Sequence, residues 1–438
     1  MRRLTTTGMP RRVAQIAVVL AVAAVPDPRP ADAQPQARER VTFDEAVARA
    51  IERNPSAAIA AAGILRADAL LAQVRSSHLL QVGASAATAT LNTGVEFEGT
   101  IVTPRNSVIA GLDVRMPIYA PVGWARRTQA EQGRNVAELD AAEVRRQTAL
   151  ATADAYLAIV ARRRVVEANV RARDLARAYF ELASELERQG RGSRLDRLRA
   201  QLILSSDETV IEAVRMAVYR AQEALGVLLA ADGPVDAAEE PTFALPPESA
   251  RSSEPSLLLQ SRTDLRLFSA EASLAERVLD DSAKDRLPFF EGLFQPRTTY
   301  PGQFFSPRNS WQLVLQVSVP LWDSGQRAGQ RLERRAAVDL SRATLDGAVR
   351  AVASDLRTAR EAVASAERAL VSARAAAGQS REVVDIIAIS VRAGGATNIE
   401  VIDAERRARD ADTAAAIAED TWRRAQLDLL TALGLFPR

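Results

Sequence analysis

The sequence of 438 residues contains no cysteine and only one histidine, His78. A chain without cysteine forms no disulfide and cannot be lipidated on a cysteine thiol. Zinc sites of the Cys/His type and Cys–His catalysis are therefore excluded, and a histidine-dependent triad would have to use His78. We expect His78 to be an ordinary, partly exposed side chain, and we expect the protein to carry no metal and no cofactor.

Lysine is also nearly missing, with Lys284 as the single example, so arginine supplies almost all of the positive charge. The formal net charge of the whole chain is +2, and it becomes −1 when residues 1–33 are left out. The high isoelectric point is therefore no argument for binding to a phosphate backbone, and we expect no nucleic-acid partner.

Residues 1–33 have the pattern of a secretory signal peptide. Four arginines between positions 2 and 12 precede the apolar run 13–25, and Ala31-Asp32-Ala33 fits the small-residue cleavage rule. We expect cleavage before Gln34 and export from the cytoplasm, with a retained N-terminal anchor as the alternative. No later stretch has 18 consecutive apolar residues, which predicts no transmembrane helix, so any membrane passage would have to be made by strands.

The rest of the chain contains an internal duplication. RQGRGSRLDRLR at 188–199 corresponds to RAGGATNIEVID at 392–403, and the Met-Pro-Ile-Tyr that begins at Met116 corresponds to the Val-Pro-Leu-Trp that begins at Val319. Shared order and nearly constant spacing are not expected by chance. We divide the chain into a signal peptide, a first repeat, a proline-rich linker expected on the surface, and a second repeat: 1–33, 34–231, 232–262 and 263–438.

Each repeat contains two candidate strands joined by a loop rich in proline, glycine or aromatic residues. The clearest alternation follows Ser107, where apolar side chains at Val108, Ala110 and Leu112 share one face, while Asp113 and Arg115 lie on the other. The predicted strands are about 80–91, 107–118, 289–299 and 309–321. They are compatible with two hairpins on a soluble sheet, or with lipid-facing barrel strands of about 9–11 residues.

A very long helix and a return helix follow each strand pair, giving predicted helical hairpins at 121–231 and 324–433. Pro121 suits the first turn of a helix, and Asp323 or Ser324 is the expected cap of the second long helix. A helix of roughly 70 residues is about 100 Å long, which no compact domain needs.

The duplicated stretch that joins the helices of each hairpin predicts a tight helix–turn–helix tip. Gly190 and Gly394 can adopt the left-handed conformation that ends a helix. Thr397 and Glu400 have capping-box spacing, and Ser193 with Asp196 is a variant of it. The structural interpretation of both carboxylates is that they satisfy free amides at a helix start.

These tip motifs, together with MPIY and VPLW, resemble the TolC family of outer-membrane efflux proteins, and the duplicated plan covers nearly the whole mature chain. The resemblance implies a fold that is mainly α with a membrane β-barrel portion, in which a protomer has a duplicated helix–helix–strand–strand–helix–helix plan. It also implies a homotrimer in the outer membrane, with a twelve-stranded β-barrel that continues into a twelve-helix α-barrel across the periplasm.

The resemblance further implies that an inner-membrane transporter and its periplasmic adaptor dock at the tips. The matching tip-turn residues are Gly190, Gly192, Ser193, Gly394, Gly395 and Thr397. On the same basis Glu400, Asp403 and Asp196 would line an acidic constriction that attracts cations. Val391 and Ala396 depart from the family pattern, because some members carry Tyr and Arg there to tie the closed tip together.

The function implied is an outer-membrane exit duct of a tripartite efflux or secretion system, which conducts substrates passively and is not an enzyme. The alternative is a soluble periplasmic coiled-coil adaptor or scaffold, which would explain the long helices but not the two alternating strand pairs. An enzyme is the third class, but no carboxylate here comes with a nucleophile elbow or a phosphate loop.

Overall fold

The computed structural model describes residues 38–247, 260–302, 307–393 and 395–437. The chain divides into two units, Met1–Arg38 and Glu39–Arg438, and the account below concerns the second. The expected signal peptide and Gly394 lie outside the described residues.

The first repeat consists of short helices, a strand pair and a long helical hairpin. Pro121 occupies the first turn of its long helix, as expected, and the Asn54 carboxamide oxygen caps another helix by accepting from the Ser56 amide at 2.9 Å. The main elements are α1 (Phe43–Arg53), α2 (Pro55–Ser76), β2 (Gln81–Thr90), β5 (Asn106–Tyr119), α3 (Pro121–Arg188) and α4 (Arg194–Leu228), with β3 (Val95–Phe97) and β4 (Thr100–Thr103) between β2 and β5.

The second repeat follows the same order, with α6 (Thr263–Asp280), the 3-10 helix η2 (Asp281–Arg286), β7 (Phe289–Tyr300), β8 (Asn309–Ser318), α7 (Gln326–Arg392) and α8 (Asn398–Ala432). Strand β8 ends before Pro320, which has no amide proton to donate to a ladder. Helix α7 begins later than predicted, and the Asp323 carboxylate accepts from the amides of Gly325 at 3.2 Å and Arg327 at 3.0 Å.

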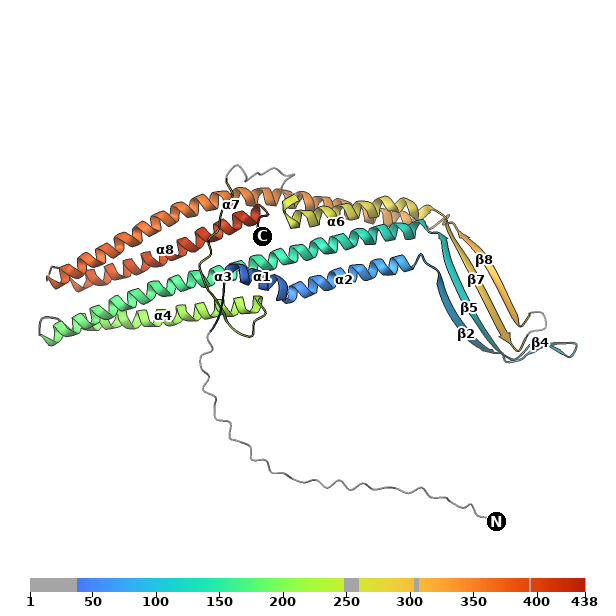
Figure 1. Cartoon of the computed structure of the whole chain (residues 1–438), viewed down its shortest axis with the longest axis horizontal. Helices are drawn as coiled ribbons and strands as arrows, with labels where there is room; N and C mark the ends of the chain where they lie inside the picture. Colours follow the sequence, from blue (N-terminus) through green and yellow to red (C-terminus); the bar gives the residue numbers. More distant parts are fainter. Residues whose placement is uncertain (1–37, 248–259, 303–306, 394, 438) are drawn as a thin grey trace, which may run out of the picture. The chain divides into compact units, whose positions relative to one another are not determined.

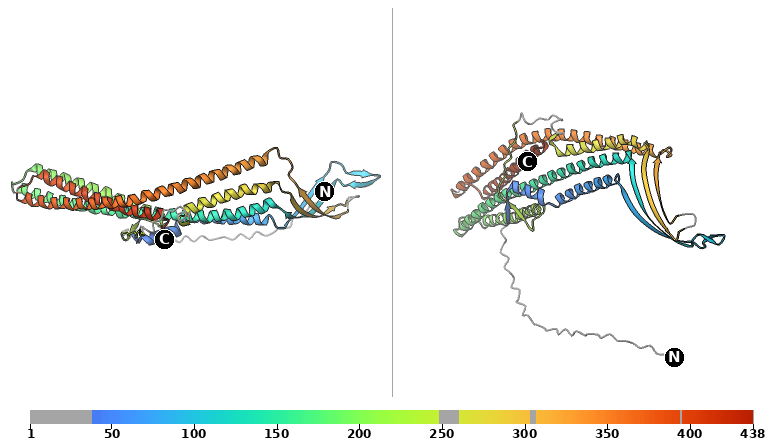
Figure 2. Two further views of the ribbon diagram at one scale, coloured as in Figure 1. Left: turned by 90° about the horizontal axis from the view of Figure 1, so that it is seen from above. Right: turned by 45° about the vertical axis from the view of Figure 1, so that its right-hand side comes forward.

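The strands β2, β5, β7 and β8 form one antiparallel sheet in the order β2-β5-β7-β8. Figure 1 shows this sheet at one end of α2, α3, α6 and α7, while the turns between α3 and α4 and between α7 and α8 lie at the opposite end. Figure 2 shows the same arrangement from two further directions. The duplicated tips and the strand pairs are thus separated by the length of the long helices.

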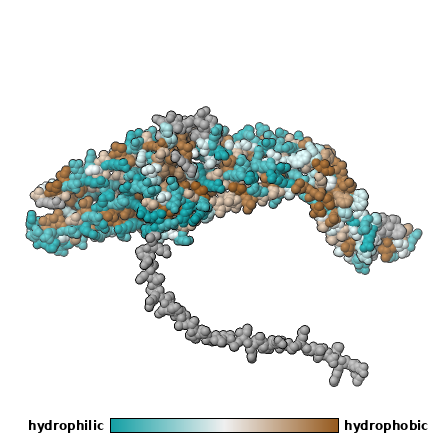
Figure 3. All heavy atoms as spheres, viewed as in Figure 1, coloured by the Kyte–Doolittle hydropathy of each residue, from teal (hydrophilic) through white to brown (hydrophobic). Residues whose placement is uncertain are grey.

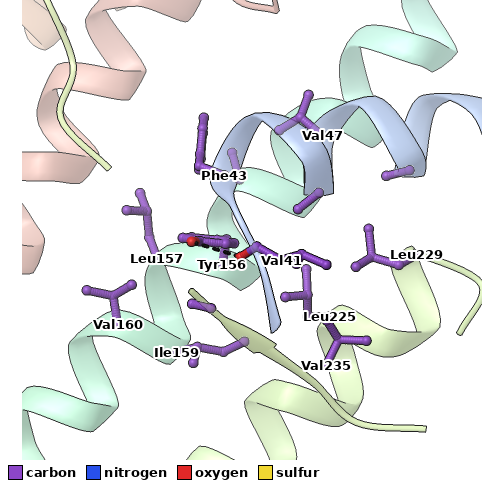
Figure 4. Close-up of a cluster of buried hydrophobic side chains, with 14 of the residues drawn as sticks. Val41, Phe43, Val47, Tyr156, Leu157, Ile159, Val160, Leu225, Leu229 and Val235 are labelled. Atoms are coloured by element: carbon purple, nitrogen blue, oxygen red, sulfur yellow. Dashed lines mark hydrogen bonds between the residues drawn. The ribbon is translucent and has the colours of Figure 1, made fainter. Parts of the chain in front are cut away.

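A buried core lies midway along the long helices, where β1 (Glu39–Val41) pairs in parallel with β6 (Val235–Ala237). The Tyr156 hydroxyl lies within hydrogen-bonding distance of two carbonyl oxygens, that of Val41 at 3.2 Å (Figure 4) and that of Glu239 at 2.9 Å. Val235 and Ala237 are 1% and 0% exposed. The start of the proline-rich linker is therefore part of the core, which differs from the expected surface position, because β1 supplies a partner for its backbone.

Among the residues described, α2 is long and apolar enough to cross a membrane by length and composition, although the sequence predicted no such helix. The helix carries charged side chains that pair with α3, through Asp68 with Arg134 at 2.5 Å and Arg75 with Glu131 at 3.1 Å. Only 11% of its apolar window is buried. These ion pairs favour a position of α2 beside α3. The exposed apolar side chains of α2 remain available for another contact.

Candidate functional site

The first tip joins α3 to α4 through Gly190 and Gly192. Gly190 has a φ of +71°, the left-handed conformation that glycine adopts without strain. A Cβ on Gly192 would lie 2.9 Å from the Leu186 Cβ, so this position needs a glycine because the turn packs closely. The amides of Arg191 and Gly192 both donate to the Leu186 carbonyl at 2.9 Å, which closes the end of α3.

The second tip joins α7 to α8 through a full capping box. The Thr397 amide donates to the Glu400 Oε2 at 2.6 Å, and the Glu400 amide donates to the Thr397 Oγ1 at 3.4 Å. Hydrogen bonds from the backbone and then the side chain of Thr397 hold the pKa of Glu400 below its ordinary value. The Gly395 amide donates to the Ser390 carbonyl at 2.8 Å.

The three acidic residues of the expected constriction are each engaged on their own helix. Glu400 completes the capping box, and Asp403 pairs with Arg407 at 2.8 Å one turn along α8. On the other tip, Asp196 Oδ2 accepts from the Ser193 Oγ at 2.8 Å. The described residues contain no group of three or more His, Cys, Asp or Glu side chains that could hold a metal ion. Within one chain, each of these three carboxylates therefore has a partner on its own tip.

An apolar cluster that the sequence analysis missed holds the two tips together. It buries Tyr179 and Ala183 of α3, Ala200 of α4 and Val401 of α8, and Val391 of α7 packs against it. Burial, followed by the nearby charges of Asp196 and Glu405, raises the pKa of Tyr179 to about 12. Val391 thus makes an apolar contact at the position where some TolC-like proteins carry a tyrosine.

A buried ion pair, also missed from the sequence, joins α4 to α8 next to this cluster. The Arg409 Nη1 donates to the Asp207 Oδ1 at 2.7 Å, and the Asp207 side chain is 5% exposed. Burial raises the pKa of Asp207, and the adjacent Arg409 opposes that shift. Because Asp207 belongs to the first repeat and Arg409 to the second, this pair ties the two helical hairpins to each other.

Glu405 lies beside the same pair at a cavity of about 260 Å³, whose lining includes Leu202, Asp207, Ile402 and Arg406. Its Oε2 atom is buried and makes no hydrogen bond to any described residue. Burial, followed by the charge of Asp207, raises the pKa of Glu405 to about 7. The contact between the hairpins therefore contains a carboxyl group that titrates near neutral pH.

The sheet has one apolar face and one polar face. The apolar face carries large side chains that are open to solvent in the single chain, including Trp311 (71% exposed), Leu313 (70%) and Leu315 (66%). Figure 3 shows apolar residues gathered over the strands, whereas the helical part is mixed and largely hydrophilic on the same side. An apolar surface of this kind marks a site of interaction with lipid or protein.

The polar face is joined across the sheet by hydrogen-bonded side chains. The Ser85 hydroxyl donates to Asp113 at 3.3 Å, the Gln295 amide donates to Asp113 at 2.6 Å, and the Gln312 amide donates to Gln295 at 2.5 Å. The charged residues on this face are two acids and two bases, which occupy successive positions along the β5–β7 pair. In order they are Glu291, Arg115, Asp113 and Arg297. The polar face of the strands therefore carries no net charge.

Aromatic side chains mark both ends of the strands. Near the helices, the Tyr119 ring lies 5.3 Å from the Trp124 ring and 5.6 Å from the Phe290 ring. At the far ends, Tyr300 is the last residue of β7 and Trp311 is the third residue of β8. Aromatic residues on either side of an apolar band are typical of strands whose ends lie at the two surfaces of a membrane.

Comparison with known proteins supports this arrangement at the level of both family and fold. Residues 255–435 match the sequence model of the family described as outer membrane efflux protein. No match is found among curated protein sequences.

The expected TolC-like fold is confirmed by solved structures. The outer membrane protein VceC of Vibrio cholerae is 17% identical with a TM-score of 0.76, and the match covers 90% of this chain and 96% of that chain. The CmeC outer membrane channel of Campylobacter jejuni is 15% identical with a TM-score of 0.79, over 90% and 85% of the two chains. The open-state MtrE outer membrane channel of Neisseria gonorrhoeae is 18% identical with a TM-score of 0.70, over 90% and 88%.

The helical tips, the two-faced sheet and the sequence match in the second repeat agree with one another. Residues 255–435 of the second repeat match the outer membrane efflux protein family, and the chain has the fold of the TolC-like channels.

Proposed function

We propose that this protein is the outer-membrane exit duct of a tripartite efflux or secretion system and works as a homotrimer. The observation that carries the proposal is the sheet, whose apolar face exposes Leu313 and Leu315. Its edge strands β2 and β8 each have one edge without a partner strand among the described residues. An open sheet edge cannot face lipid, and a sheet of this size cannot close on itself. Three copies would supply the missing partners.

Two alternatives from the sequence fit this family and fold less well. A soluble scaffold has no use for a sheet with one largely apolar, exposed face. The match of residues 255–435 to the outer membrane efflux protein family supports a transport protein and not an enzyme.

The experiment is to purify the protein in detergent, measure its mass by light scattering and reconstitute it in a planar bilayer. We expect a mass near three protomers and conducting channels. A monodisperse monomer that stays in solution without detergent would overturn the proposal.

We also propose that the tips receive a periplasmic adaptor and an inner-membrane transporter. Support comes from the two tip turns, in which Gly190 and Gly192 hold tight, exposed loops at the end of α3 and Thr397 caps α8. Gly394 and Gly395 complete the second turn in the sequence. Such exposed, well-defined loops on rigid helices are suited to recognition.

We propose that the narrowest part of the duct is an acidic constriction. It would be formed by Glu400 and Asp403, with Asp196 from the first repeat. Both α8 residues lie in its first two turns, and three copies would place several carboxylates around one axis. Negative rings in a pore favour cations.

Replacing Glu400 and Asp403 together with alanine tests the constriction. We expect weaker cation preference and weaker block by multivalent cations in bilayer recordings, because the ring loses its charge. The matched control is Asp410→Asn on the same helix, which is exposed and lies further from the tip. If the double variant and the control have the same selectivity, the two carboxylates serve their own helix only.

A further inference from the structure

The two unpaired edges of the sheet belong to different repeats. Strands β2 and β5 form the first hairpin, β7 and β8 form the second, and Figure 1 shows β2 and β8 at opposite sides of the sheet. The hairpins meet at the β5–β7 pair in the middle. In a ring of copies they would meet again where β8 of one copy reaches β2 of the next.

The duplication fixes which residues of the two hairpins correspond. Met116 near the end of β5 corresponds to Val319 just after β8, and the first residues of β2 and β7 are Gln81 and Phe289. These two assignments agree with the observed registers. Ser85 pairs with Gly111 in the first hairpin, and their counterparts, Leu293 and Val314, pair in the second.

The β5–β7 pair therefore provides a template for the missing contact. There Arg115 lies opposite Leu293, and Val114 lies opposite Phe294. The counterpart of Arg115 in the second hairpin is Ser318, and the counterpart of Leu293 in the first hairpin is Ser85. By the same correspondence, the counterpart of Val114 in the second hairpin is Val317, and the counterpart of Phe294 in the first hairpin is Ala86.

We propose that β8 of one copy pairs antiparallel with β2 of the next copy in the register of the β5–β7 pair. Ser318 then lies opposite Ser85 of the next copy, and Val317 lies opposite Ala86. This inference rests on the proposed homotrimer and adds the residues that close it.

The faces of the sheet agree with this register. Ser318 and Ser85 both belong to the polar face, while Val317 and Ala86 both belong to the apolar face. A shift by one residue would place Val317 opposite Ser85 and exchange the faces along the whole strand. A shift of β8 against β2 by an even number of residues keeps the two faces matched, so only such registers are alternatives to the proposed one.

Side-chain size is also complementary between the two edge strands. The apolar face of β2 is built from small side chains, including Ala84, Ala86 and Thr88, whereas β8 presents Leu313 and Leu315, which are 70% and 66% exposed. Small residues on one strand leave room for large ones on its neighbour, so the two edges can pack closely.

Disulfide cross-linking tests the register cleanly, because the natural chain has no cysteine. Residues directly opposite in antiparallel strands have Cα atoms about 4.5–5.5 Å apart, which suits a disulfide, whereas diagonal neighbours are about 7–8 Å apart. We expect the Ser318→Cys, Ser85→Cys double variant to form covalent dimers and trimers when membranes are treated with a mild oxidant.

The comparison pairs are Ser318→Cys with Gly83→Cys and Ser318→Cys with Ala87→Cys, which match registers shifted by two residues. We expect at least tenfold less cross-linked product from either pair. Gln81→Cys with Arg115→Cys, which lie opposite each other within one chain, shows that the oxidant reaches the polar face.

Stronger cross-linking in a shifted pair would overturn the register and leave the trimer intact. Absence of cross-linking in all three pairs, in a protein whose mass is that of a trimer and whose internal control is oxidised, would overturn the pairing of β8 with β2. A monomeric mass in detergent would overturn the proposed function itself.

Discussion

The strand wall and the helical tips place their apolar and charged side chains in opposite ways. On the sheet, Leu313 and Trp311 are 70% and 71% exposed, while charged residues share a polar face that has no net charge. At the tips, Ala200 and Val401 are 1% and 6% exposed, and the charged Asp207 is buried with them. In the proposed trimer, the sheet would depend on lipid and on other copies for its stability, whereas the tips are held by contacts within one chain.

Under the proposed function, this difference would separate membrane insertion of the sheet from opening of the duct at the tips. The sheet has one stable position, because the apolar face of its strand β8 must be covered by lipid or protein. A contact made of a small apolar cluster and one buried ion pair can be released at moderate cost, which suits a region that has to move. Variants in the sheet and at the tips test this difference.

The largest effect is expected from a charge on the apolar face of the sheet. Leu313→Arg puts a cation toward lipid, where it costs about 2–4 kcal/mol near the bilayer midplane, and a trimer would contain three copies. We expect the amount of folded trimer in outer-membrane fractions to fall sharply. The matched control is Gln312→Arg, on the polar face of the same strand, which should insert normally. Equal loss in both variants would contradict the assignment of the two faces.

The second variant breaks the ion pair between the hairpins. Arg409→Ala leaves the buried Asp207 carboxylate without its partner, which costs on the order of 3 kcal/mol for a buried pair. We expect faster hydrogen–deuterium exchange in the facing parts of α4 and α8 and a larger resting conductance, with normal trimer levels. Arg215→Ala is the control, because Arg215 is an exposed residue of α4 whose partner, Glu212, is exposed as well. If both variants behave like the parent protein, the pair does not hold the tips.

A pH dependence should distinguish the tips from the sheet. The pKa of Glu405 is raised to about 7 by burial, then by Asp207. The other ionisable residues around it are Tyr179, Arg406, Arg409, Arg171, Arg381, Asp385 and Asp412. A raised pKa means that the folded tip binds the proton more tightly than the unfolded chain. The resulting stability is fully present below about pH 4.5 and is lost as the pH rises through about 7.

Hydrogen–deuterium exchange measures this effect when it is corrected for the intrinsic pH dependence of amide exchange. We expect protection of the α4–α8 contact to fall roughly tenfold between about pH 5.5 and 7.5, a change that follows from the displaced pKa. Glu405→Gln should remove most of this dependence, while Asp410→Asn, at an exposed position, should keep it. A dependence that persists in Glu405→Gln would assign the titration to another group.

The smallest effect on folding is expected at the first tip turn. Gly190→Val forces a β-branched residue into a φ of +71°, at a cost of about 1–2 kcal/mol. We expect weaker adaptor binding and export with little change in outer-membrane level. Gly378→Val within α7 is the control, because nothing lies within 4 Å of its added Cβ and its φ is not positive. Normal export combined with a reduced outer-membrane level would contradict a docking role for this turn.

The sequence by itself determined the features that depend on neighbouring residues. Alternation around Asp113 predicted a strand with two faces, Pro121 predicted the start of a long helix, and the Thr397–Glu400 spacing predicted a capping box that is present. Comparing the repeats then aligned the two tips. Each of these patterns spans about ten residues or fewer, because strand pleating, helix caps and turns are short-range properties of the backbone.

The tertiary structure alone decided the contacts between distant segments. Asp207 and Arg409 are separated by 202 residues, so no local pattern marks either as buried or paired. Val235 looked like part of a surface linker, yet it is 1% exposed because β1, almost 200 residues earlier in the chain, pairs with its strand. Glu405 acquires a pKa of about 7 only where α4 and α8 enclose it. Burial and charge depend on what the fold brings alongside a residue, and here those neighbours come from the other repeat.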